Sequence, residues 1–235
     1  MNELKSKITA NIIIAVIAAL AIVVSSMILV NGVEKVKGGN NRIIVTGSAK
    51  QQITSDLIVW TGSFTERSPE LQNAYAQLEA DKGKVLDYLV GKGVPKDAIV
   101  FSSINTNTYY IVLPNGQYTR DVDYYELYQT VTISSEEIDK ITEISRNVTE
   151  LINEGIQLQS NAPQYMYTKI ADLKVTMLAE ATKDATKRAQ MIAENAGNKL
   201  GKLKYADMGV IQITPLYSNE VSDYGMNDTY SLEKE

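Results

Sequence analysis

The stretch Tyr109–Gln129, YYIVLPNGQYTRDVDYYELYQ, decides the fold, because two β-rich runs flank an Asn115-Gly116 dipeptide. Asn-Gly between two such runs is the strongest short-range signal for a β-hairpin. The stretch also holds six of the chain's 14 tyrosines. It therefore predicts an antiparallel strand pair, and it raises the question whether the tyrosines form a binding site.

The hydrophobic pattern and the turn predict the same strand register. If Asn115 and Gly116 are the two loop residues, the numbers of opposite residues in runs 98–113 and 121–133 sum to 231. One face is then apolar and the other polar, and a shift by one residue would mix the two sets. The apolar face pairs Ile104 with Leu127, Val100 with Val131 and Ala98 with Ile133, and the polar face pairs Asn107 with Tyr124, Asn105 with Glu126 and Ser103 with Tyr128.

This register spreads the tyrosines over both faces and the tip, so it predicts no convergence on one point. Tyrosine is common on half-buried strands, which is the simplest interpretation. A protein–protein surface is a second interpretation, because tyrosine is enriched in interface cores. An aromatic site for a small ligand is a third. The candidate interaction surface consists of Tyr124 and Tyr128 on the polar face and of Tyr109, Tyr110 and Tyr118 near the tip.

The N-terminus predicts a membrane-spanning helix. No charged residue occurs between Lys7 and Glu34, and residues 8–30 span roughly 35 Å as a helix, which exceeds the ~30 Å hydrocarbon core. A cleavable signal peptide is the alternative, although the apolar run is longer than a typical signal core. Lysines flank both ends, so charge does not fix the orientation. We expect a cytoplasmic N-terminus and a single pass, with the following domain outside the cytoplasm.

Composition excludes several kinds of chemistry. The chain has no cysteine and no histidine, which removes disulfides, thiol catalysis and the commonest general base. The net charge of −5 makes nucleic acid an unsuitable partner. No phosphate loop, dinucleotide fingerprint or zinc pattern is present. We therefore expect no enzyme activity, no cofactor and no metal; an enzyme that uses carboxylates would need two acids in one cleft with strongly shifted pKa values.

The rest of the chain predicts an α+β fold, with three main helices on one face of a largely antiparallel sheet. Strands are expected at 42–48, 53–64 (apolar on both faces, and so central and covered), 156–167 (interrupted near Pro163) and 202–214. Helices are expected from Ser68 to Gly91, from Ser135 to Gly155 and from Thr168 to Ala196. The expected organisation is an anchor at 1–37, a linker at 38–41, an α+β region at 42–214 that could divide into lobes 42–134 and 135–214, and a loose, polar, acidic tail at 215–235.

Several phrases resemble the SIMPL domain family of envelope proteins. They are IIVTGSAKQQITSDLIVWTGSFTERSPELQNAYAQ, VLDYLVGKGVPKDAIVFSSINTNTYY, YELYQTVTIS and LAEATKDATKRAQMIAENAGNKLGK, and they cover about residues 42–210. No single phrase is diagnostic, but their order and spacing are typical of the family. Family members usually continue with a final β-strand rich in Val, Ser and Phe, and this sequence stops where that strand would begin.

The resemblance implies an α+β fold, an extracytoplasmic location and ring-like homo-oligomers. It implies no catalytic residues, and it links the family loosely to stress protection and envelope integrity. The main hypothesis is therefore a membrane-anchored, self-assembling envelope scaffold. The alternative is an extracytoplasmic module that binds a peptide or glycan on the polar tyrosine face.

Overall fold

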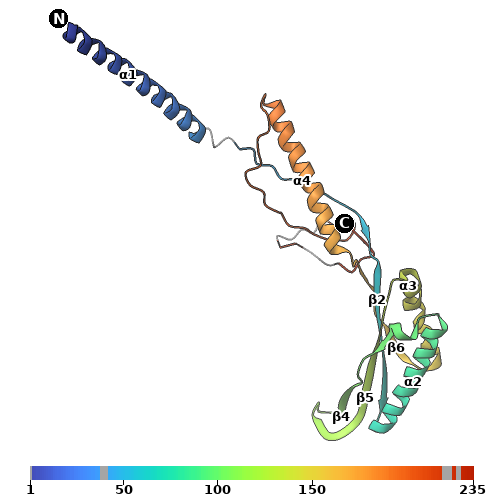
Figure 1. Ribbon diagram of the computed structural model, residues 1–235. Coiled ribbons are helices and arrows are strands. Elements are labelled where there is room, and N and C mark those ends of the chain that lie inside the picture. The colour runs from blue at the N-terminus through green and yellow to red at the C-terminus, as the bar shows by residue number, and fades with distance from the viewer. Residues whose placement is uncertain (1, 38–41, 219–223, 226–228) are drawn as a thin grey trace. The chain divides into compact units, whose positions relative to one another are not determined.

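The computed structural model describes residues 2–37, 42–218, 224–225 and 229–235 (Figure 1). The chain forms two compact units, one made of residues 1–47 with 182–202 and the other of residues 48–181 with 203–235. The expected linker 38–41 and parts of the expected tail lie outside the described residues. The elements are helices and antiparallel strands, which confirms the predicted α+β class.

The first unit contains α1 (Asn2–Lys37). Its segment Val16–Val33 is long and apolar enough to cross a membrane, and its side chains are exposed. This agrees with the predicted spanning segment 8–30. A signal sequence near an N-terminus has the same length and composition, so both interpretations of α1 remain compatible with the structure. The unit also holds residues 182–195 of the long helix α4 (Ile170–Asn195).

The second unit is built on a six-stranded antiparallel sheet. The two long strands, β2 (Leu57–Ser68) and β5 (Tyr118–Ser135), lie side by side at its centre. β3 (Ile99–Phe101) and β4 (Asn105–Val112) both pair with β5, and β6 (Gln157–Ser160) and β7 (Gln164–Met166) both pair with β2. The break between β6 and β7 contains Pro163, as predicted, because proline cannot donate to a strand ladder.

One face of β2 carries the core. Ile58, Trp60 and Phe64 are fully buried there, and the close packing of Trp60 on Gly62 leaves no room for a side chain at residue 62. The helices α2 (Leu71–Gly91) and α3 (Ile138–Asn147) and the 3-10 segment η3 (Val148–Glu154) bury their apolar stripes against this face (Figure 1). Residues on the other face of β2 are half-buried. β2 is therefore central, as predicted, and its second face is partly covered.

Two expected strands do not form. Residues 42–48 and 202–214 have no regular structure and pair with no strand among the described residues. In the second stretch, Asp207 and Gly209 interrupt the apolar alternation that a strand requires. Pairing with another segment begins only at the end of this second stretch. There the Thr214 amide donates to the Glu235 carbonyl at 3.0 Å, and the next residue, Pro215, forms an isolated bridge with Lys234.

The last residues of the tail, much of which was expected to be loose, pair with the start of the second unit. β8 (Glu233–Lys234) pairs with β1 (Ile53–Thr54) to form a second, two-stranded sheet. The Lys234 side chain is 2% exposed, and its Nζ donates to the Tyr165 carbonyl at 2.9 Å. The Ser55 amide donates to the Leu232 carbonyl at 2.8 Å. Backbone bonds and a buried amine therefore fix residues that have no strand signal of their own.

Helix boundaries agree closely with the sequence signals. α2 begins at Leu71, and the Ser68 hydroxyl accepts a hydrogen bond from the Glu70 amide at 3.2 Å, so serine marks the entry without being the cap residue. Gly155 and Gly197, which follow η3 and α4, have φ values of 90° and 72°. Glycine is favoured at such positions because a Cβ would be strained there. A short 3-10 turn, η2 (Lys96–Ala98), connects α2 to β3.

Candidate functional site

The tip of the β4–β5 hairpin is a three-residue loop and not the predicted two-residue loop. The Leu113 amide donates to the Gln117 carbonyl at 2.8 Å, and the Gly116 amide donates to the Leu113 carbonyl at 2.8 Å. Pro114 and Asn115 occupy the centre of this turn, and Gly116 has a φ of 82°. A turn followed by a left-handed glycine is the next commonest hairpin connection after the two-residue loop.

The loop and the β-bulges shift the strand register from the predicted one. From Asn105, which lies opposite Tyr128, to Tyr109, which lies opposite Tyr124, the shift is two residues, and it keeps each of these side chains on its predicted face. Along β3 the shift is one residue, so the expected pairing of Val100 with Val131 is wrong. Val100 is 59% exposed, whereas its neighbour Ile99 is 8% exposed.

The one-residue difference arises between β3 and β4. Between its pairings in β3 and in β4, the chain has one residue more than the matching part of β5. The Ser102 amide donates to the Thr130 carbonyl at 2.8 Å, and Gln129 Nε2 donates to the Ser102 carbonyl at 2.6 Å. These bonds hold the extra residue as a bulge, which hydrophobic alternation alone does not reveal.

Two candidate tyrosines do converge, contrary to expectation. The rings of Tyr109 and Tyr124 stack with centroids 4.7 Å apart and planes 16° apart. The Tyr109 hydroxyl donates to Glu126 Oε1 at 3.1 Å, and Arg67 Nε donates to Glu126 Oε2 at 2.6 Å. The Arg67 guanidinium lies 5.4 Å from the centroid of the Tyr124 ring. These four residues, hereafter the Arg67–Glu126 cluster, link the end of β2 to the middle of β4 and of β5.

Electrostatics support the cluster. Burial by itself would raise the pKa of Glu126, but hydrogen bonds from Arg67 and Tyr109 outweigh it and hold this pKa below its ordinary value. The bond to Glu126 raises the pKa of the Tyr109 phenol. Both groups therefore keep their neutral-pH forms, a carboxylate acceptor and a phenol donor.

The other three candidate tyrosines lie apart from this cluster. Tyr128 is half-buried opposite Asn105 and Thr65. Tyr110 is 44% exposed and Tyr118 is 77% exposed, and both belong to the tip. The tip also exposes Ile111, Val112 and Leu113, and residues 105–119 contain no charged residue. The five tyrosines thus divide between a hydrogen-bonded cluster and an exposed apolar tip.

A shallow depression of about 470 Å³ adjoins the Arg67–Glu126 cluster on the face of the sheet that the helices leave open. Ser63 and Thr65 provide hydroxyl groups, and Gln157 and Gln159 of β6 provide amide groups. Such a lining could form hydrogen bonds with a neutral polar ligand.

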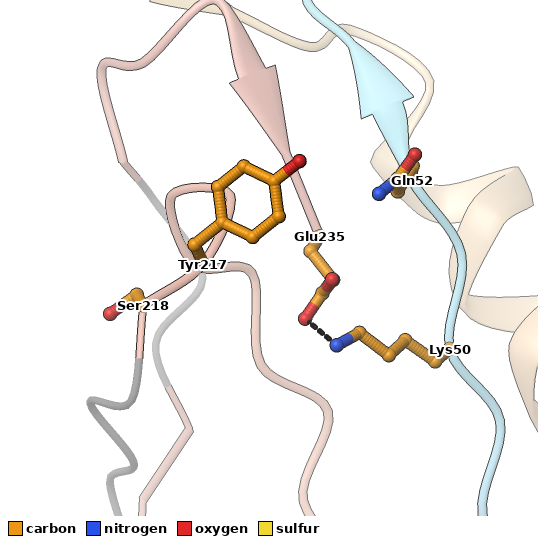
Figure 2. Close-up of a pocket in the computed structure, with 5 residues that line it drawn as sticks. All are labelled: Lys50, Gln52, Tyr217, Ser218 and Glu235. Carbon is orange, nitrogen blue, oxygen red and sulfur yellow. Dashed lines mark ion pairs between the residues drawn. The ribbon is translucent and has the colours of Figure 1, made fainter.

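A second open depression, of about 610 Å³, lies beside β1 and β8. Figure 2 shows Glu235 between Tyr217 and Lys50, with Gln52 and Ser218 at the margins. Lys50 and Glu235 form an ion pair. Because Lys50 precedes β1 and Glu235 follows β8, the simplest role of this pair is to help hold β8 against β1. Among the described residues no group of three acids could hold a metal ion.

A pair of acids, one buried and one half-buried, was missed from the sequence. Asp81 of α2 is 6% exposed and faces Glu66 of β2, and Lys84 Nζ lies 3.5 Å from Asp81 Oδ1. Burial and then the hydrogen bond and charge of Asp81 raise the pKa of Glu66 to about 7. Asp81 stands between Leu78 and Val85 in the apolar stripe of α2, and this polar position within the stripe was the available signal. The pair lines neither of the two depressions.

Comparisons with known proteins identify the family. No curated protein matches the chain at a significant level. Residues 43–231 match the family described as SIMPL, protein of unknown function (DUF541). The match covers most of the chain, including the hairpin, the whole six-stranded sheet and α4. The α+β chain with its N-terminal apolar helix therefore belongs to the SIMPL family.

Proposed function

We propose that this protein is held in a membrane by α1, with its α+β region outside the cytoplasm, and that it works by self-association as a scaffold of the cell envelope that protects cells under stress. The observation that carries the proposal is the exposed tip of the β4–β5 hairpin. Ile111, Val112 and Leu113 are 41%, 53% and 43% exposed, beside Tyr110 and Tyr118.

The chemistry of the tip suits a protein partner. Contiguous exposed apolar surface on a folded domain marks interaction sites more often than chance. Tyrosine supplies large contact area at little cost in conformational entropy and is enriched in the buried centres of interfaces. Charge, which is depleted in such centres, is absent from residues 105–119.

We expect the full chain in detergent to form a defined oligomer by size exclusion with light scattering. The double substitution Ile111→Asn/Leu113→Asn should dissociate it, because it removes apolar contact area from the tip. A matched control is Leu71→Asn/Val90→Asn, which changes two aliphatic side chains of α2 that are each 44% exposed. A monomeric wild type would overturn the scaffold proposal, and equal oligomers in both variants would move the contact away from the tip.

The membrane orientation can be tested by cysteine labelling, because the chain has no cysteine of its own. In intact cells a membrane-impermeant maleimide should react with Tyr118→Cys, at an exposed tip position, and should spare Ser6→Cys, which precedes the apolar segment. The reverse pattern would place the folded region in the cytoplasm. Recovery of the chain without its first 30 or so residues would show a cleaved signal.

The Arg67–Glu126 cluster favours a second candidate function, the binding of a neutral glycan or peptide in the adjoining depression. The depression offers hydroxyl and amide groups, and the cluster offers aromatic rings. Such groups match those that recognise uncharged polar ligands. Binding of neutral oligosaccharides and uncharged peptides, measured by calorimetry, should be lost in Tyr124→Ala and Tyr128→Ala while the melting temperature is kept. A fall in melting temperature with no ligand bound by wild type would assign both tyrosines to packing.

A further inference from the structure

β4 is a long strand at the edge of the six-stranded sheet. Its eight residues pair with β5 on one side, and no strand among the described residues pairs with the other side. All eight residues are exposed. The other outer strands are shorter, with three residues in β3, four in β6 and three in β7. β4 therefore offers the longest row of backbone groups to another chain.

The usual protections of an edge strand are missing from β4. Natural sheets block their edges with charged side chains, proline, bulges or very short strands. The sequence NTNTYYIV contains no charge, no proline and no glycine. The extra residues near the tip lie in β5, between Val112–Tyr118 and Tyr109–Tyr124, so β4 itself stays regular. The nearby charges, including Arg120, Asp121 and Asp123, also lie in β5.

From this edge we propose that β4 pairs antiparallel with β4 of a second copy, around a twofold axis that passes between the two strands, so that one sheet continues across two copies. The inference rests on the proposed self-association and names its contact. A twofold axis makes the contact self-complementary, because the same row of donors and acceptors serves both copies.

The sequence of β4 suits its own copy better than a charged peptide. A charged partner strand would find no complementary charge along residues 105–112. If the axis passes near Tyr109, Thr108 lies opposite Tyr110 and Thr106 lies opposite Val112 of the second copy, and such β-branched and aromatic pairs stabilise adjacent strands. Anchoring by α1 would also confine copies to one surface with a common orientation, which raises their effective concentration.

A single-cysteine scan of residues 105–112 in the full chain, reconstituted in lipid, tests the pairing without background from native cysteines. In a symmetric antiparallel pair, the offset along the strand direction between a residue and its own copy grows by about 6.6 Å for each residue away from the axis. A disulfide tolerates Cα separations of roughly 4.4–6.8 Å. Oxidation should therefore give covalent dimers at one position near the centre of β4, with loss of the dimer two residues away on either side.

Each other outcome has a distinct meaning. Cross-linking at most positions along the strand would show in-register parallel pairing or non-specific contact, and either result overturns the inference. If no position cross-links while the oligomer persists, the scaffold proposal survives and the β4 contact is wrong. If the chain is monomeric, both proposals fail.

A charge test complements the scan. Thr106→Lys/Thr108→Lys places cations on the edge and should abolish the cross-link at the central cysteine. The control Gln72→Lys/Gln77→Lys adds the same charge to exposed positions of α2. Equal melting temperatures for the two variants will show that the lysines act on association. An unchanged cross-link in the edge variant would contradict strand pairing at β4.

Discussion

Gly62→Ala is expected to lower the free energy of unfolding by about 1–3 kcal/mol, the usual cost of overpacking a core. A Cβ at residue 62 would lie 2.8 Å from Cη2 and 2.9 Å from Cζ2 of Trp60. Trp60 is fully buried, and its Nε1 donates to Ser160 Oγ at 3.0 Å. Movement of the ring away from the new Cβ would disturb this bond, and Val131 Cγ1 would lie 3.5 Å from the same Cβ.

The same substitution at Gly83 provides a control of opposite sign. Gly83 lies inside α2, and a Cβ there meets nothing within 4 Å. Gly83→Ala should therefore raise the free energy of unfolding by about 0.5–1 kcal/mol, because alanine loses less backbone entropy in a helix than glycine does. Urea unfolding of both variants, followed by circular dichroism, measures the two changes. Equal effects of one sign would contradict the close approach of Trp60 to residue 62.

Glu66→Gln is expected to stabilise the protein at about pH 8 by roughly 1–3 kcal/mol and to have little effect near pH 4. The pKa of Glu66 is raised to about 7 by burial and by Asp81, from an ordinary value of 4.5. The folded state thus holds this proton more tightly than the unfolded chain. Its stabilising contribution is complete below pH 4.5, declines as the pH rises, and is lost above about pH 7. The range allows for the partial exposure of Glu66.

The difference in unfolding free energy between Glu66→Gln and wild type, measured by urea titration at several pH values, isolates this effect from other acids. Asp81→Asn should make the loss of stability between low and high pH smaller than in the wild type, because it removes the charge that opposes ionisation of Glu66. A difference that is the same at low and high pH would show that the two acids do not share a buried site.

Local signals predicted most of the elements. The apolar stripes of α2 and α3, the glycines that follow the helices and the Asn115-Gly116 turn are all carried by neighbouring residues. β2 was predicted as central because its apolar residues are continuous. Packing that depends on distant residues was not predicted. β8 has the sequence Glu-Lys, which carries no strand signal, and its pairing with β1 comes from backbone bonds between the two ends of the second unit.

The candidate site shows the same limit. The sequence identified the five tyrosines, but the stacking of Tyr109 on Tyr124 depends on a register that bulges set. Arg67 was not singled out, because it lies more than fifty residues from its partner Glu126 and belongs to another strand. Glu66 and Asp81 were missed because they lie on different elements, β2 and α2, whose packing against each other no local signal predicts. A polar residue inside an apolar stripe, as at Asp81, is the one signal that could have indicated a buried partner.

Trp60 is the single tryptophan of the chain, and it lies at the centre of the second unit. Excitation at the red edge of the absorption spectrum, where tyrosine does not absorb, therefore gives fluorescence from one fully enclosed indole. This fluorescence reports on the β2 core and does not respond to changes at the hairpin tip or in α1. The protein thus carries an internal fluorophore that separates melting of the sheet from association of its edge, without any added label.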